Sequence, residues 1–197
     1  MRKTNYLLIV LACLSLNACI PLIFGGATTA GVVAAQERSA GNAVDDLGIR
    51  LAINNRFFNK DINDLYRNVT IKVTEGRVLL TGDVDKPENK IRATELSWGI
   101  KGVREVINEI QVNDKSGIAD YANDSWIANQ VRAKFLLEKN LRSVNYNVEV
   151  VNAVVYLFGI AQDKNELDKA NYIASTTSGV KQVINHVVMK EDQRRVK

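Results

Sequence analysis

The strongest constraint on the fold is an internal repeat, because residues of the first half of the chain recur 77 positions later. Gly82 in the first copy corresponds to Gly159 in the second copy. Further pairs keep this spacing: Val73 and Val150, Val78 and Val155, Leu80 and Leu157, Ala93 and Ala170, Gly102-Val103 and Gly179-Val180, and Val106-Ile107-Asn108 and Val183-Ile184-Asn185. One extra residue before the first strand of the second copy shifts the opening helices, so that Phe57 corresponds to Phe135. This many matches in register predict two copies of one small domain, over 44–113 and 122–190.

Each copy has the pattern of a helix, two strands, a second helix and a third strand. The opening helices show apolar residues four positions apart, at Ile49, Ile53 and Phe57 and at Ile127, Val131 and Phe135. Asp46 and Asp124 come just before these residues, and we predict them as helix N-caps. The β-rich runs are 69–73 and 77–81, joined by Glu75-Gly76, and 147–151 and 154–158, joined by Asn152-Ala153.

The second helices are predicted at 87–98 and 164–175, and the final strands at 103–112 and 180–189. Each second helix carries the chain back across the sheet, so the last strand should run parallel to the strand that precedes the helix. We therefore predict an α+β fold. Each copy should form a mixed three-stranded sheet with both helices on one face.

The first residues have the pattern of an export signal. Arg2 and Lys3 precede an apolar core at 6–16, which ends in Leu16-Asn17-Ala18-Cys19. This junction resembles the lipobox of bacterial lipoproteins, although Asn17 stands where Ala, Ser or Thr is usual. The resemblance implies a signal peptide at 1–18 and acyl chains on Cys19. Because Ile20 rather than Asp follows the cysteine, it also implies a lipid-anchored protein at the outer membrane, facing the periplasm.

An uncleaved signal anchor is the alternative, since the uncharged stretch 4–36 is long enough for a spanning helix of about 20 residues. Pro21 and Gly25-Gly26 interrupt that stretch and favour cleavage. We expect 19–43 to be the lipidated cysteine and a flexible leash. The cleaved chain would keep no thiol for a disulfide or a metal site, since Cys13 is discarded and Cys19 is acylated.

The helix that opens the second copy carries an aromatic residue that its core does not need. At about 100° per residue, Trp126 projects about 150° from the centre of the stripe formed by Ile127, Val131 and Phe135. Gln130, Ala133, Lys134 and Leu137 lie on its side of the helix. The equivalent position in the first copy is Gly48, so the fold does not require an aromatic residue there. We predict that this side contacts a membrane; the alternative is that Trp126 packs against the first copy.

The order of elements, the glycines that close the second strands, and the two Gly-Val…Val-Ile-Asn motifs resemble BON domains. Two such domains behind a lipobox are similar to the dual-BON outer-membrane lipoproteins. The match covers the whole chain, with a linker at 114–121 and a charged tail at 191–197. The resemblance implies anionic phospholipid binding through the first helix of the second domain, with Trp126 in contact with lipid, a role in envelope integrity, and no catalysis.

Charge and composition are consistent with a membrane partner. Residues 44–113 contain 11 basic and 11 acidic side chains, whereas 122–197 contains 11 basic and 8 acidic ones, so the second copy is the basic one. His186 is the sole histidine, and we find no nucleophile motif, phosphate-binding loop or metal-ligand cluster. We therefore expect neither an enzyme nor a cofactor, and export makes nucleic acid an unsuitable partner. A structural adaptor that binds an envelope protein is the alternative function.

Overall fold

The computed structural model describes residues 39–113 and 118–195. The predicted signal peptide, Cys19 and the leash up to residue 38 lie outside these ranges. In the first copy the elements are α3 (Ala40–Lys60), β1 (Val69–Thr74), β2 (Arg77–Val84), α4 (Pro87–Trp98) and β3 (Glu105–Val112). In the second copy they are α5 (Ile118–Leu137), β4 (Tyr146–Val151), β5 (Val154–Ala161), α6 (Lys164–Ser175) and β6 (Gln182–Met189). The predicted α-β-β-α-β order is confirmed in both copies.

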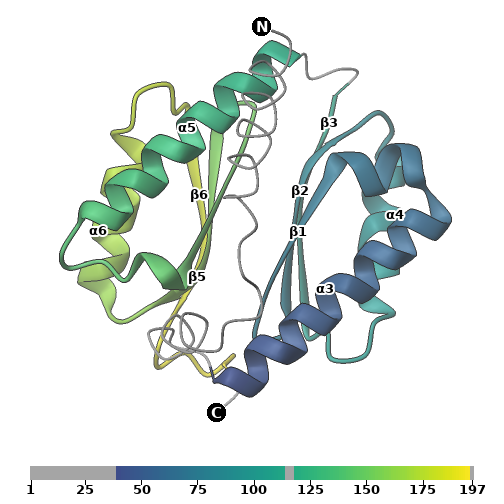
Figure 1. The fold of residues 1–197 in the computed structure, drawn as a ribbon, viewed down its shortest axis with the longest axis horizontal. Helices are drawn as coiled ribbons and strands as arrows, with labels where there is room; N and C mark the ends of the chain where they lie inside the picture. The colour runs from purple at the N-terminus through teal and green to yellow at the C-terminus, as the bar shows by residue number, and fades with distance from the viewer. Residues whose placement is uncertain (1–38, 114–117, 196–197) are drawn as a thin grey trace, which may run out of the picture. The chain divides into compact units, whose positions relative to one another are not determined.

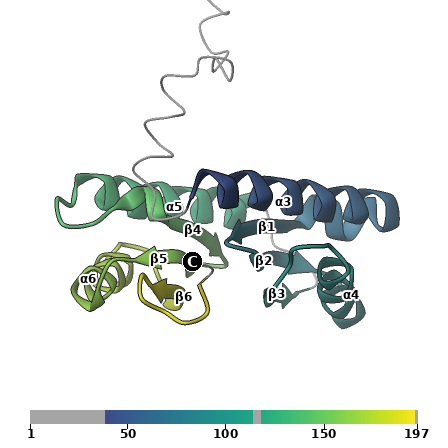
Figure 2. The same cartoon turned by 90° about the horizontal axis from the view of Figure 1, so that it is seen from below.

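Both sheets have the predicted mixed topology. β1 pairs antiparallel with β2, and β2 pairs parallel with β3; β4, β5 and β6 repeat this arrangement. Figure 1 shows α3 and α4 on one face of their sheet and α5 and α6 on one face of the other. Within the second copy, α5 lies along β4 and α6 along β6 (Figure 2).

The opening helices supply the centre of each core. Ile53 and Phe57 in α3 are fully buried, as are Ile127 and Val131 in α5. They pack against the inner face of the adjacent sheet, where alternate strand residues such as Leu80 point inward. The four-residue spacing read from the sequence therefore marks the buried side of each helix.

The prediction that Asp46 and Asp124 are N-caps is wrong, because both helices begin earlier. α3 begins at Ala40 with Ser39 as its N-cap, and α5 begins at Ile118, within the predicted linker. The Asp46 carboxylate instead accepts hydrogen bonds from the backbone N–H groups of Glu75 and Gly76, both at 2.9 Å. Asp124 does the same for the second hairpin turn, at 2.7 Å and 2.8 Å. Each aspartate thus fastens its helix to the β-hairpin.

These turns need such support because both central residues have positive φ. The values are 53° and 71° for Glu75 and Gly76, and 54° and 65° for Asn152 and Ala153. This is the pattern of the type I′ hairpin turn, whose two N–H groups the aspartate satisfies. Ala153 has a β-carbon but adopts a backbone conformation that favours glycine. The hydrogen bond from its N–H group to Asp124 offsets part of the resulting strain.

The second face of each sheet packs against the other copy, which the sequence analysis did not predict. A shared apolar cluster joins the two sheets and contains Leu79, Val151, Tyr156 and Phe158, with Ile107, Val154 and Ile184 at its edge. The buried guanidinium of Arg77 lies 5.1 Å from the centre of the Phe158 ring. β2 and β5 are therefore covered on both faces, which explains the apolar runs 78–80 and 154–158 within them.

Polar contacts surround this cluster. The Lys72 and Glu149 side chains are 3.1 Å apart, and His186 Nε2 lies 2.8 Å from Glu109 Oε1. Gln111 donates to the Tyr156 hydroxyl at 3.1 Å. Burial raises the pKa of Tyr156, and the nearby carboxylates of Glu109 and Asp83 raise it further, against the opposing effect of the Gln111 hydrogen bond. His186 is thus a structural partner of Glu109 at this interface.

Candidate membrane-contact site

The five predicted contact residues lie along one side of α5. Trp126 is 66% exposed and Leu137, three turns further on, is 81% exposed. Ala133 and Lys134 between them are also exposed. The helical period places Trp126, Ala133 and Leu137 opposite the buried stripe, whereas Gln130 and Lys134 lie on the flank nearer to it. We call this set (Trp126, Gln130, Ala133, Lys134 and Leu137) the α5 face.

The opposite side of the same helix is fixed in the core. Phe135 is 1% exposed and meets the Tyr146 ring edge-on, with ring centres 5.5 Å apart. Arg132 extends along the edge of the sheet, where it donates to the backbone carbonyl of Val148. α5 is therefore held in one rotational setting, and that setting turns Trp126 away from the sheet and leaves it 66% exposed.

Lys134 links the α5 face to the end of α6. Lys134 Nζ donates to Thr177 Oγ1 at 3.0 Å, and Thr177 Oγ1 in turn donates to the carbonyl of Ile173 at 2.8 Å. Within the described residues, Gln130 Nε2 is buried without a hydrogen-bond partner. A side chain with unused donor capacity thus lies one turn from Trp126.

The charge around the C-terminal end of α5 is positive. Glu138 follows Leu137, but Lys169 Nζ lies 3.2 Å from its carboxylate. The side-chain hydrogen bond from Lys169 lowers the pKa of Glu138, and a backbone hydrogen bond from Asn140 adds to the effect. Because Glu138 is neutralised in this pair, the exposed Lys134 and Lys139 dominate the local charge.

Several exposed apolar residues were missed by the sequence analysis. On the same helix Tyr121 and Leu136 are exposed, and Tyr121 had been assigned to the linker. α3 in the first copy also exposes a row opposite its core: Val44, Leu47, Leu51 and Phe58. These residues recur at intervals of three, four and seven positions, which is a helical pattern that the sequence already contains. It was overlooked because the stripe of Ile49, Ile53 and Phe57 is the stronger pattern.

In the described part of the chain, no group of three or more His, Cys, Asp and Glu side chains is placed to hold a metal ion. Across the same residues, no helix has the length and apolar composition needed to cross a membrane.

Comparison with known proteins identifies the repeated domain. The family model for the BON domain matches residues 45–114 and 123–191. An uncharacterized protein in the gshII 5' region of Anaplasma centrale is 40% identical over 153 residues, which are 77% of this chain and 99% of that protein. The outer membrane lipoprotein DolP of Haemophilus influenzae is 32% identical over 88% of this chain and 89% of its own length. Osmotically-inducible protein Y of Escherichia coli is 28% identical over 76% of this chain and 75% of its own length. The chain therefore belongs to the BON-domain family, with two copies of the domain in tandem.

Proposed function

We propose that this protein is an outer-membrane lipoprotein that supports the envelope without catalysis, and that its second BON domain contacts anionic phospholipid through the α5 face. Similarity to an outer membrane lipoprotein over most of both chains supports the location. The observation that carries the lipid contact is the 66% exposure of Trp126 on the helix that also exposes Leu137 and Lys134. A helix surface that presents an aromatic ring, an aliphatic side chain and a lysine suits the interface between head groups and acyl chains.

The energies involved are sufficient for a measurable effect. Apolar burial contributes about 25 cal/mol per Å², so partial burial of the Trp126 ring contributes on the order of 2 kcal/mol. A loss of that size weakens binding more than tenfold. Each basic residue near an anionic surface adds about 1 kcal/mol, and this part falls with salt.

Trp126→Ala is therefore expected to weaken binding to anionic vesicles at least about tenfold. The measurement is co-sedimentation of the Val33–Lys197 chain with phosphatidylcholine vesicles, with and without phosphatidylglycerol. This chain contains both cores and the sheet interface, so we expect it to fold by itself. Trp98→Ala is the matched control, because Trp98 is the other tryptophan and is half exposed in the first copy. The Trp98→Ala chain also makes fluorescence report on Trp126 alone, and lipid should shift its emission to the blue.

Lys134→Glu should weaken the same binding by an amount that shrinks at high salt, whereas Lys86→Glu in the first copy should have little effect. Point variants are preferable to isolated copies. Separating the copies would uncover Leu79 and Phe158, and an exposed apolar sheet face binds surfaces without specificity. If Trp126→Ala binds vesicles as the parent chain does, the α5 face is not the lipid contact. An adaptor that binds an envelope protein then becomes the better account.

The anchor has a separate test. Cys19→Ala is expected to release the protein from membranes or leave it unprocessed, because stable anchoring requires more than one acyl chain or a second membrane signal. Membrane fractionation and intact mass of the native protein provide the measurement. A native N-terminus at Met1 without acyl mass would favour the signal anchor instead.

A further inference from the structure

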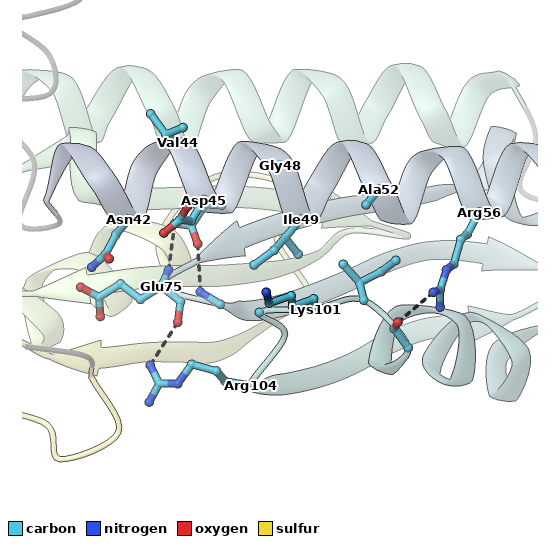
Figure 3. A pocket seen from close by; sticks show the side chains of 15 residues that line it. Asn42, Val44, Asp45, Gly48, Ile49, Ala52, Arg56, Glu75, Lys101 and Arg104 are labelled. Carbon is cyan, nitrogen blue, oxygen red and sulfur yellow. Dashed lines mark hydrogen bonds between the residues drawn. The ribbon is translucent and has the colours of Figure 1, made fainter.

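The first copy contains a groove at the position where the second copy carries Trp126. It runs between α3 and the segment that connects α4 to β3, and its volume is about 930 Å³, within the range of small-molecule sites. Val44, Gly48, Ile49 and Ala52 line one side and Ile100 lines the other. Figure 3 shows Ile49 pointing from α3 toward the segment that carries Lys101, whereas Val44 points away from it at the rim. We call it the α3 groove.

Two small residues keep the α3 groove open. Gly48 is equivalent to Trp126 and Ala52 to Gln130, so the first copy lacks the two large side chains that the second copy has at these positions. A β-carbon added to Gly48 would meet nothing within 4 Å. Glycine is unfavourable within a helix, and no positive φ or close contact requires it here. The absence of a side chain at Gly48 leaves this part of the α3 groove open.

Basic residues border this apolar surface. Arg56 closes one end, where it donates to the backbone carbonyls of Leu96 and Gly99 at 3.1 Å and 2.8 Å. Arg104 lies toward the other end and also donates to carbonyls, and Lys101 lies between the two (Figure 3). Among the described residues, none of these three cations forms an ion pair with a carboxylate.

The acidic residues of the groove are largely engaged elsewhere. Asp46 accepts two backbone N–H groups of the hairpin turn, and Glu75 forms a bidentate pair with Arg195, at 3.0 Å and 2.9 Å. Asp45 is the exposed carboxylate at the rim. The charge available to a ligand is therefore positive, above an apolar floor.

We propose that the α3 groove binds one acyl chain that carries an anionic head group, such as a long-chain fatty acid. The chain would lie along Gly48, Ile49 and Ala52, with the head group near Lys101 and Arg104. The apolar floor of the groove matches the acyl chain, and the cations without a carboxylate partner match the anionic head group. A neutral apolar ligand would leave these cations without a partner. The α3 groove is distinct from the α5 face, so an experiment can contradict the proposal for one of these sites without contradicting the proposal for the other.

The experiment titrates the Val33–Lys197 chain with cis-parinaric acid, whose fluorescence rises when its chain enters an apolar site. We expect saturable binding that palmitate displaces and hexadecanol displaces at least tenfold less effectively. Lys101→Glu should weaken parinarate binding about tenfold at low salt and less at high salt. Trp126→Ala should leave it unchanged.

Ala52→Gln provides the decisive variant, because the equivalent Gln130 has a buried amide nitrogen in the second copy. It should weaken parinarate binding at least tenfold while the thermal melt and circular dichroism stay those of the parent chain. Leu51→Gln is the control, since Leu51 faces outward from the same helix. If Ala52→Gln impairs folding, the Lys101→Glu chain tests the same site. Absence of saturable binding, or unchanged binding in a folded Ala52→Gln or Lys101→Glu chain, would overturn the proposal, as would its loss in Trp126→Ala.

Discussion

Phe135→Ala is expected to lower the free energy of unfolding by about 3–5 kcal/mol, the range for a truncated core aromatic. Phe135 is enclosed between α5 and the sheet, in edge-on contact with Tyr146. Its removal loses the transfer free energy of the ring and leaves a cavity that the fixed backbone around β4 cannot fill. Thermal melts monitored by circular dichroism should show a midpoint lower by about 10 °C.

Trp126→Ala is the matched comparison on the same helix, nine residues before Phe135. It should change the free energy of unfolding by no more than about 0.5 kcal/mol, as is usual for surface substitutions. The two variants thus separate folding from recognition, because Phe135→Ala should retain vesicle binding at temperatures where it remains folded. A large stability loss in Trp126→Ala would contradict the outward orientation of its ring and would place it at a packed interface.

The sequence was sufficient to predict the architecture of each copy because the repeat supplied an internal check. An ambiguous segment in one copy could be compared with its counterpart in the other. α4 and α6 begin and end where predicted, at Pro87–Trp98 and Lys164–Ser175. Pro87 at the first turn marks the start of α4. The final strands were predicted from residues 103 and 180, but they begin two residues later, at Glu105 and Gln182.

The roles of Asp46 and Asp124 were not predictable from local pattern. An aspartate before an apolar stripe has the same appearance whether it caps its own helix or a turn elsewhere in the chain. The hairpin turn that each one stabilises lies about 30 residues away. Local sequence rules describe neighbours along the chain, so such contacts require the structure.

The packing of the two sheets was missed for a related reason. Val78-Leu79-Leu80 is a continuous apolar run, and such runs indicate a strand covered on both faces. From the sequence, both helices were expected on one face of each sheet, and no cover was assigned to the other face. The α5 face, by contrast, follows from helical geometry and required no tertiary information. The hydrogen bond from Lys134 to Thr177 could not be predicted without tertiary information, because the end of α6 approaches α5 only in the folded domain.

Gly159→Ala is expected to destabilise the second copy by at least about 2–3 kcal/mol. Gly159 has φ of 147° and lies opposite Tyr146 in the β4–β5 ladder. A β-carbon there would lie 1.9 Å from the backbone oxygen of Asn145. Backbone strain of this kind costs about 1–3 kcal/mol, and the contact with a main-chain atom adds to it because neither strand can shift without breaking the ladder. Chemical denaturation of the Val33–Lys197 chain provides the measurement.

Gly82→Ala and Gly48→Ala complete the comparison. Gly82 occupies the equivalent place in the first copy, with φ of 126° and the Asn68 oxygen 1.9 Å from an added β-carbon, so its substitution should be about as costly. Gly48 lies in open helix, where alanine should be neutral or stabilise by roughly 0.5–1 kcal/mol. Equal effects at all three positions would contradict the described strand geometry. Because the α5 face depends on the second sheet beneath it, Gly159→Ala should also reduce vesicle binding as the second copy unfolds, whereas Gly48→Ala should not.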